Sequence, residues 1–514
     1  MINAAGRIIP DKIRGIENYK AYEGKDGIQP TGNIAGKTLR TSKPNQDKIL
    51  ANLEAAIKAT GLKNGDRVSF HHHFRNGDFV VELVVRELHR LGFKDMTLAP
   101  SSLADCHDFL PEFIENGTIS AIETSGLRGG LGRFLTQNPN ALKRPAVVRS
   151  HGGRARAIAS GEVKIDVAFI GVPVADRMGN ANGIHGQSAC GSLGYAMIDA
   201  RYAEKVVLLT DNLIDGFVCP ISIPQTDVDY IVPVEKIGDP KKIASGAVRI
   251  TRDPIQLYLA EQAAEVIEHS GYFKEGFSFQ LGAGGSSLAV AKFVREKMLA
   301  QNIKGGFQLG GSTGIGSELL AEGLFDTFYD TQTFDTTAAA SLRDNPRHQE
   351  ISAGWYADPW SPNPLVNELD IVCLASTEVD VDFNVNVITD SNGVLMGASG
   401  GHSDTAYGAK LSIVLTPILR GRLPMILDKV QSIVTPGDTV DVIVTDYGIA
   451  VNPNRPDLLA ALQGKGLNLK TMQELQAIAH ELVGKPKALE YTDDIVAIIE
   501  YRDGTIIDVV RKPK

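Results

Sequence analysis

The strongest constraint on this chain is a repeated order of elements, in which a buried strand leads through a polar loop into an apolar helix. In the first half, R-V-S-F (67–70) precedes the loop H-H-H-F-R-N-G-D (71–78) and a strongly apolar helix over residues 79–91. Further buried strands are predicted at 146–149, 167–172 and 206–209. Alternating strands and helices predict a parallel or mixed sheet covered by helices.

The second half repeats this order. A strand (277–281), a Gly-rich loop (282–287) and an apolar helix (288–298) follow one another, and a further strand comes next. Buried strands that lead into polar segments with Asp and Asn also occur in both halves, at 166–183 and 369–386. Long internal similarity of this kind predicts duplicated domains.

We therefore expect an α/β fold with two similar domains, each a parallel or mixed sheet covered by helices. A stretch rich in Pro, Lys and Gly at 230–253 places the boundary near Gly246, which gives domains 1–245 and 246–514. The polar residues before Gln46 predict an extended or loosely ordered arm. Because ligands of open α/β sheets bind outside the carboxyl ends of the strands, an active-site cleft is expected between the domains.

Local signals fix several elements. Apolar spacing predicts a helix over about 46–60, and Asp253-Pro254 is typical of a helix start. Residues 457–514 predict two helices and a β-hairpin whose turn is Asp503-Gly504.

Composition excludes several classes of protein. The 514 residues exceed the size of a single core, and a net charge of −9 disfavours non-specific nucleic-acid binding. Four scattered cysteines indicate buried thiols in a reduced compartment. No apolar run reaches membrane-spanning length, and the N-terminus lacks the apolar core of a signal peptide. We expect a cytoplasmic enzyme without nucleic-acid or membrane partners.

Gly-rich polar loops carry the main functional signal. The stretch 394–406, V-L-M-G-A-S-G-G-H-S-D-T-A, can aim several backbone N–H groups at one point, as oxyanion stabilisation requires. Other such loops occur at 282–287, at 310–314, and at Gly129-Gly130 with Gly152-Gly153. None fits a P-loop or a complete dinucleotide fingerprint. Together the loops favour binding of carboxylates or of a carbonyl that becomes an oxyanion.

Other motifs leave alternatives open. His71-His72-His73 suggests a metal site, but consecutive strand residues face opposite sides, so a hydrogen-bonding role for one histidine is favoured and no metal is expected. His402 can act on a substrate or begin a helix, and Asp404 can be an N-cap. G-x-S-x-G occurs in two loops, yet the late His480 is expected in an amphipathic helix, which is a poor position for a hydrolase triad.

At these residues the chain resembles the family I CoA-transferases, with their α-type and β-type halves fused. The segment 172–180, V-P-V-A-D-R-M-G-N, resembles the α-half A-D-x-x-G-N, and 396–404, M-G-A-S-G-G-H-S-D, resembles the β-half G-x-G-G-x-x-D. Where that family has its first Gly-rich loop, this chain has His72, His73 and Arg75. Within this group the resemblance is closest to the citrate lyase α-chain family and covers nearly the whole chain.

The chain differs from ordinary CoA-transferases at one motif that concerns the mechanism. Ordinary CoA-transferases carry S-E-N-G, whose Glu forms covalent intermediates, whereas this chain has Q-L-G-G-S-T-G with Gly311 or Ser312 in that place. Glu318 falls later, in an expected helix. The resemblance therefore implies direct exchange through a mixed anhydride, in which acetyl-ACP and citrate give citryl-ACP and acetate.

The resemblance also implies roles for individual residues. Catalytic roles are expected for Gly400, Gly401, His402 and Ser312. Substrate binding is expected for Arg75, Asn76, His72, Gly310, Gly311, Thr313, Ser399 and Asp404. Binding of the thioester arm is expected for Gly282, Gly284, Gly285, Ser286 and Asn180.

Partners and cofactors follow from the same resemblance. We expect an oligomeric complex with a lyase β chain and an acyl-carrier γ chain, and no cofactor bound by this chain. The thioester donor would be the phosphopantetheine-type, dephospho-CoA-derived arm of the carrier, or CoA itself. The alternatives are a generic CoA-transferase or acyl-CoA hydrolase, and a non-catalytic carboxylate-binding scaffold.

Overall fold

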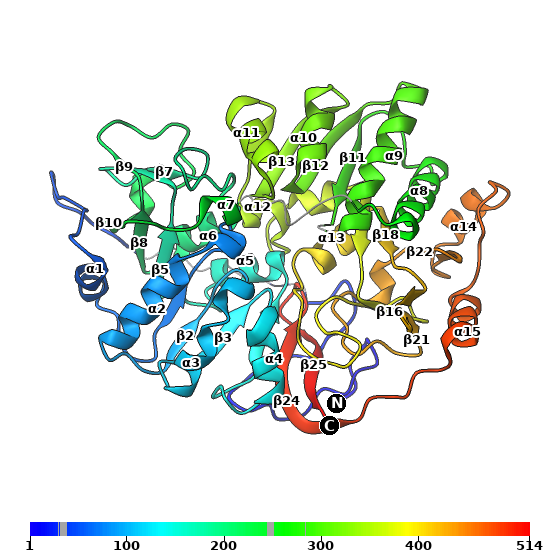
Figure 1. Cartoon of the computed structure of the whole chain (residues 1–514), viewed down its shortest axis with the longest axis horizontal. Coiled ribbons are helices and arrows are strands. Elements are labelled where there is room, and N and C mark those ends of the chain that lie inside the picture. Colours follow the sequence, from blue (N-terminus) through cyan, green and yellow to red (C-terminus); the bar gives the residue numbers. More distant parts are fainter. Residues whose placement is uncertain (29, 31–38, 244–250, 283) are drawn as a thin grey trace.

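The molecule consists of two α/β halves that stand side by side (Figure 1), in agreement with the predicted fold class. The computed structural model describes residues 1–28, 30, 39–243, 251–282 and 284–514. The blue-to-cyan half and the green-to-orange half each contain a large sheet covered by helices. Among the described residues, no helix is both long and apolar enough to cross a membrane.

The N-terminal sheet has the strand order β10-β8-β5-β1-β2-β3-β4-β24-β25. Neighbouring strands are parallel up to β24, and β24–β25 is antiparallel. Its strands are β1 (Arg67–Ser69), β2 (Met96–Leu98), β3 (Ile119–Thr124), β4 (Ala146–Arg149), β5 (Val167–Gly171), β8 (Lys205–Thr210), β10 (Tyr230–Pro233), β24 (Tyr491–Glu500) and β25 (Ile506–Pro513). Its helices are α1 (Leu53–Thr60), α2 (Val80–Arg90), α3 (Leu110–Glu115), α4 (Gly129–Gln137), α5 (His151–Ala159), α6 (Gly194–Tyr202) and α7 (Pro240–Ile243).

The C-terminal hairpin belongs to this first sheet, which corrects the predicted division of the chain. Ala497 on β24 pairs with Ala146 on β4, and both lie in the N-terminal hydrophobic core. The red hairpin accordingly lies against the cyan half (Figure 1). The apolar run of β24 covers the otherwise open edge of β4, so a second domain of 246–514 is wrong in its last segment. The predicted boundary near Gly246 lies outside the described residues.

The C-terminal sheet has the order β14-β13-β12-β11-β15-β18-β22-β23. Among the described strands of this sheet, only the pair β22–β23 is antiparallel. Its strands are β11 (Phe277–Leu281), β12 (Gly305–Ser312), β13 (Phe325–Thr333), β14 (His348–Glu350), β15 (Ile371–Ala375), β18 (Leu411–Leu415), β22 (Val442–Thr445) and β23 (Gly448–Val451). The helices are α8 (Pro254–His269), α9 (Gly285–Gln301), α10 (Gly314–Ala321), α11 (Thr336–Asp344), α12 (Ala353–Ala357), α13 (His402–Gly408), α14 (Pro456–Leu462) and α15 (Met472–Val483). Asp253 caps α8 through the amide of Gln256, as the sequence predicts.

The internal duplication is clearest in two small sheets, with the orders β7-β6-β9 and β17-β16-β21. In the first, Asp176 accepts hydrogen bonds from the backbone and side chain of Asn180. In the second, Asp380 accepts the same bonds from Asn384. The strands are β6 (Val174–Asp176), β7 (Ala181–Asn182), β9 (Leu213–Ile214), β16 (Glu378–Asp380), β17 (Val385–Asn386) and β21 (Ile426–Leu427), and a short hairpin of β19 (Leu419–Arg420) and β20 (Leu423–Pro424) stands beside them. The duplication predicted from the sequence is thus confirmed.

The start of the chain is better ordered than expected. Ile9 and Ile13 pack against Val147 and Ile498 in a small core cluster, and Asn3 Nδ2 donates to the Ile507 carbonyl at 2.7 Å. The arm therefore covers the C-terminal hairpin. The cysteines also differ in part from expectation, because Cys190 and Cys373 are buried but Cys219 is exposed.

Candidate functional site

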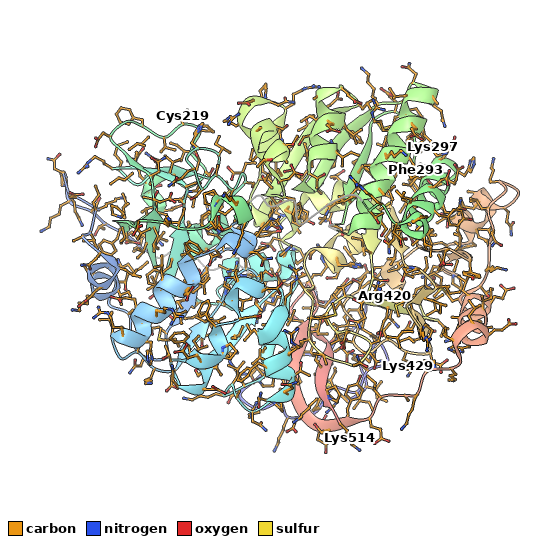
Figure 2. All side chains as sticks on the ribbon, viewed as in Figure 1. Cys219, Phe293, Lys297, Arg420, Lys429 and Lys514 are labelled. Carbon is orange, nitrogen blue, oxygen red and sulfur yellow. The ribbon has the colours of Figure 1, made fainter. Side chains whose placement is uncertain are left out.

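The candidate site lies where loops at the carboxyl ends of strands from both halves meet. His72 and Arg75 follow β1 in one half, and Gln332 and Thr333 end β13 in the other. His72 Nε2 lies 3.2 Å from Gln332 Oε1, and Arg75 Nη2 donates to the Thr333 carbonyl at 3.2 Å. In Figure 2 the labelled Cys219 and Lys514 lie at the periphery of the molecule. The site is therefore interdomain, as predicted.

Two cations without a carboxylate partner dominate its electrostatics. The Arg75 guanidinium lies 3.9 Å from the centroid of the Phe334 ring. Burial, together with the nearby charge of Arg128, lowers the pKa of Arg75 to about 9, so it stays protonated at neutral pH. Arg128 reaches solvent, yet the surrounding protein lowers its pKa by desolvation. Neither guanidinium forms an ion pair within the described part of the chain, and desolvated cations of this kind favour an anionic ligand.

The His72 ring is a neutral hydrogen-bond donor. The carbonyl oxygen Gln332 Oε1 lies 3.2 Å from Nε2 and can only accept, which assigns the ring proton to Nε2. The Ser101 hydroxyl, which accepts from the His72 backbone N–H at 3.0 Å, then donates to Nδ1, 2.5 Å away. Burial first, and then the neighbouring His151, lower the pKa of His72 well below its usual range. The ring therefore binds by hydrogen bonding and not by charge.

Unsatisfied polar atoms gather at the same place. Among the described residues, Arg75 Nε, Gln332 Nε2 and His151 Nδ1 are buried without a hydrogen-bond partner. Burial lowers the pKa of His151 to about 3, so this ring is also neutral. His72 stacks on Tyr195 with a centroid distance of 4.9 Å, and the His151 ring packs against Tyr195 at a tilt, 4.4 Å away. Because buried polar groups are nearly always paired in folded proteins, the cluster is suited to a ligand that offers several acceptors.

The loop at 397–401 joins the halves and presents free amides. Ser399 N donates to the Ser125 carbonyl at 2.8 Å, and His151 N donates to the Gly400 carbonyl at 2.8 Å. Gly400 has a φ of 56°, and a Cβ on Gly401 would lie 2.5 Å from Tyr356 Oη. The amides of Gly400 and Gly401 have no acceptor among the described residues. Their arrangement before α13 suits an oxyanion.

Gln280 at the end of β11 connects the Gly-rich loops of the C-terminal half. Its Nε2 donates to Tyr356 Oη at 2.9 Å, which itself lies against Gly401. Gly310 has a φ of 102°, and its ideal Cβ would meet Gln280 Nε2 at 2.6 Å. A Cβ on Gly284 would lie 2.8 Å from that of Ala375, whose carbonyl lies 3.1 Å from His402 Nε2. The three predicted loops therefore gather at one edge of the sheet.

The side chains of His402 and Ser312, for which catalytic roles are predicted, are hydrogen-bonded within the protein. Thr435 Oγ1 lies 2.7 Å from His402 Nδ1, and the Ala375 carbonyl engages the other ring nitrogen. Burial lowers the pKa of His402 to about 4. Ser312 is fully buried, and its hydroxyl donates to Asp330 Oδ2 at 2.6 Å. Both side chains hold loops in place, because their polar atoms are already occupied by the protein.

Asp404 and Asn180, predicted to bind the substrate and the thioester arm, are likewise hydrogen-bonded within the protein. Asp404 is fully buried and accepts hydrogen bonds from Ser150 Oγ at 2.9 Å and from Gly152 N at 2.8 Å, so it ties α13 to α5. Asn180 lies in the turn of the small β7-β6-β9 sheet, where it bonds Asp176 and Gln225. Their oxygens and amide are thus used within the fold, and the binding roles of both residues stay predictions.

The remaining predicted residues have mixed positions. Thr313 caps α10, Ser286 is buried in the first turn of α9, and Asn76 is exposed. Gly282 and Gly285 are half-buried at the start of α9. None of these placements tests the expected binding roles.

Beside Gly311, the Phe334 ring occupies the space that the glutamate of ordinary CoA-transferases would need. A Cβ on Gly311 would lie 1.8 Å from the Phe334 ring, which also carries the Arg75 guanidinium. Glu318 is exposed on α10. A glutamate at 311 is therefore sterically excluded by the aromatic ring.

No grouping favours a metal in the described residues. His71 Nε2 pairs with the Gly171 carbonyl at 2.7 Å, and His73 Nε2 accepts from Tyr195 N, so the three consecutive histidines face different partners. Glu265, Glu268 and His269 on α8 are close enough to hold a cation. However, Lys297 Nζ already lies 2.7 Å from Glu265.

Sequence reasoning missed Arg128, His151, Tyr195 and Gln332. Arg128 and His151 directly precede Gly129-Gly130 and Gly152-Gly153, so these Gly pairs were the available signal. Tyr195 and Gln332 stand in no motif that marks them.

Comparisons with known proteins give a consistent result. A family model described as citrate lyase, alpha subunit (CitF), matches residues 46–513. The citrate lyase alpha chain of Klebsiella pneumoniae is 52% identical over 496 residues, which cover 96% of this chain and 97% of that one. A crystal structure described as an α subunit of citrate lyase from Streptococcus mutans, in complex with citrate, has 50% identity and a TM-score of 0.96, with full coverage of both chains.

More distant structures share the fold alone. A 4-hydroxybutyrate CoA-transferase from Porphyromonas gingivalis is 15% identical, with a TM-score of 0.54 over 84% of this chain and 96% of that one.

Proposed function

This chain belongs to the citrate lyase α-subunit family, and from this premise we propose how its interdomain site performs the transfer that defines the family. The chain is a citrate:acetyl-ACP transferase and a subunit of citrate lyase. One observation carries the proposal. The guanidiniums of Arg75 and Arg128, which have no ion-pair partner among the described residues, occur together with the free amides of Gly400 and Gly401.

The proposed reaction has two balanced steps. A citrate carboxylate oxygen attacks the carbonyl carbon of the acetyl thioester, the C–S bond breaks, and the thiolate leaves a citryl–acetyl mixed anhydride. The thiolate then attacks the citryl carbonyl, the anhydride C–O bond breaks, and acetate leaves. No net proton is gained or lost. In both steps the amides of Gly400 and Gly401 stabilise the oxyanion.

Citrate binding is assigned to the cation pair. Arg75 and Arg128 each hold one non-reacting carboxylate, because guanidinium binds carboxylate with two parallel hydrogen bonds. His72, as a neutral donor, adds a further contact. Carboxylates are weak nucleophiles, so holding the reacting groups in attack geometry supplies much of the rate.

Direct exchange, without a glutamyl intermediate, is supported by the packing around Gly311. The Phe334 ring takes the space that a glutamate side chain would need there. The generic CoA-transferase and hydrolase alternatives are disfavoured for the same reason.

The thioester donor is proposed to be the phosphopantetheine-type, dephospho-CoA-derived arm of an acyl carrier γ chain, or CoA. The loop with Gly282, Gly284, Gly285 and Ser286 is assigned to this arm, since α9 begins there with uncapped amides. A lyase β chain completes the proposed complex, which works in the cytoplasm. This chain itself is proposed to bind no cofactor.

The test is citrate-dependent thioester exchange. The purified chain is incubated with acetyl-CoA or an acetylated carrier, with and without citrate, and thioesters and intact protein are followed by mass spectrometry. A citryl thioester, free acetate and unchanged protein mass are expected. A glutamyl adduct would overturn direct exchange, and absence of turnover with either donor would favour a scaffold.

A further inference from the structure

We propose that Gln332 donates its side-chain amide to the hydroxyl group of citrate, and so selects the hydroxylated tricarboxylate over its deoxy analogue. This inference rests on the proposed function. Gln332 ends β13 in the C-terminal half and faces His72 from the N-terminal half. It is 4% exposed, and its Nε2 has no hydrogen-bond partner among the described residues.

The direction of the amide follows from the hydrogen-bond network. The carbonyl oxygen Oε1 of Gln332 lies 3.2 Å from His72 Nε2 and can only accept, so the ring proton of His72 lies on Nε2. With its carbonyl oxygen toward His72, Gln332 directs its NH2 group the other way. Two donors on one buried nitrogen are left without an acceptor among the described residues. A substrate bound between the halves is the available acceptor.

The polar groups of citrate can be counted to identify the acceptor for the Gln332 amide. Citrate has three carboxylates and one hydroxyl. One carboxylate reacts at Gly400 and Gly401, and the other two match the guanidiniums of Arg75 and Arg128. The hydroxyl is the one polar group left, and Gln332 is adjacent to Thr333, whose carbonyl accepts a hydrogen bond from Arg75.

The proposal has an energetic consequence for specificity. A site that hydrogen-bonds a substrate hydroxyl rejects the analogue without it, because its own buried donor is then left unpaired. Tricarballylate is citrate without the hydroxyl, so it keeps every contact to the arginines and loses only the contact to Gln332. The wild-type chain is therefore expected to discriminate strongly between the two acids.

The test compares both acids with full-length wild-type chain and the variant Gln332→Met, using acetyl-CoA or the acetylated carrier as donor. We expect wild type to favour citrate over tricarballylate by about 100-fold or more in kcat/KM. Gln332→Met should reduce this ratio at least tenfold, through loss of activity with citrate, while KM for the acetyl thioester stays unchanged. Gln332→Glu keeps an acceptor for His72 but adds a carboxylate, so it should raise KM for citrate further.

Controls separate the possible failures. Gln349→Met, at an exposed position on β14, should behave as wild type with both acids. If Gln332→Met lowers activity with both acids by the same factor, Gln332 only positions His72 and the inference is overturned. If wild type exchanges no citrate at all, the proposed function itself fails, which is a different result.

Discussion

At the scale of single residues, the site is defined by groups that the fold leaves unsatisfied. Arg75, in the N-terminal half, has a left-handed φ of 53° and is held by the C-terminal half, through the Thr333 carbonyl and the Phe334 ring. His402, in contrast, has both ring nitrogens occupied. Side chains already paired within the protein serve the scaffold, whereas unpaired ones are available to the substrate.

Replacing Arg75 by Met should selectively weaken the use of citrate. Loss of a charge-assisted contact costs about 2–3 kcal/mol, or roughly 30- to 150-fold in kcat/KM for citrate. Exchange kinetics at varied citrate and at varied acetyl-CoA measure this effect. Arg177→Met, at a site whose side chain is 56% exposed, is the control and should change neither constant. An equal loss for both substrates would contradict a citrate-specific role.

Restoring a glutamate at position 311 should not restore a covalent mechanism. In Gly311→Glu the new side chain collides with the Phe334 ring, and overpacking of this kind costs about 1–3 kcal/mol. We expect a lower Tm by scanning calorimetry, reduced exchange, and no acyl adduct by intact-protein mass. Gly216→Glu is the matched control, because a Cβ at Gly216 meets nothing within 4 Å. A stable, acylated Gly311→Glu protein would refute the packing argument.

At the scale of elements, patterns with local causes were predictable and those with distant causes were not. Asp253-Pro254 starts α8, and Asp503-Gly504 turns the last hairpin, as expected. The helix predicted over 46–60 begins only at Leu53, because Asn52 caps it and Leu50 N donates instead to the Ile231 carbonyl on β10. That pairing partner lies far away in the sequence.

The site residues were also predictable only where the signal is local in the sequence. The Gly-rich loops at 397–401 and 310–314 were found because several unusual residues stand together. Gln332 and Arg128 are single residues whose meaning comes only from what the other half brings beside them. The hydrogen bond of His402 could not be predicted, because its partner Thr435 lies in a different loop, 33 positions on.

The contact between α13 and α5 should depend on the charge of Asp404. Asp404→Asn places an amide where the Gly152 N–H and the Ser150 hydroxyl now donate, and an unsatisfied buried donor costs about 1–3 kcal/mol. We expect a lower midpoint in urea unfolding, with a smaller effect on KM for citrate than in Arg75→Met. Asp493→Asn, an exposed position, serves as the control. Unchanged stability of the Asp404 variant would show that this contact does not hold the halves together.

At the scale of the whole molecule, carboxylates help to join the two halves. Glu350 on β14 accepts hydrogen bonds from Leu193 N and from Ser222 Oγ, the latter at 2.6 Å, and both donors belong to the N-terminal half. Burial raises the pKa of Glu350 to about 7. The interface is therefore sensitive to pH near neutrality.

The pH dependence has a definite sign. Because the pKa of Glu350 is raised on folding from 4.5 to about 7, its contribution to stability is fully present below about 4.5 and is lost as pH rises through about 7. Glu350→Gln cannot ionise, so its Tm relative to wild type should rise between pH 5 and pH 8.5. Thermal unfolding at several pH values measures this, with Gln349→Glu as an exposed control. Parallel curves for wild type and Glu350→Gln would exclude the effect.

The C-terminal hairpin in the N-terminal sheet has a consequence for the order of synthesis. Arg149 at the end of β4 bonds Glu500 on β24 at 2.9 Å, across 351 positions of sequence. At ribosomal rates of about 5–20 residues per second, roughly 20 to 70 s separate the translation of these two partners. The half that is made first is thus completed late, and its β4 edge stays unpaired until β24 and β25 have been translated. Only then can the sheet that carries His72 and Arg75 close.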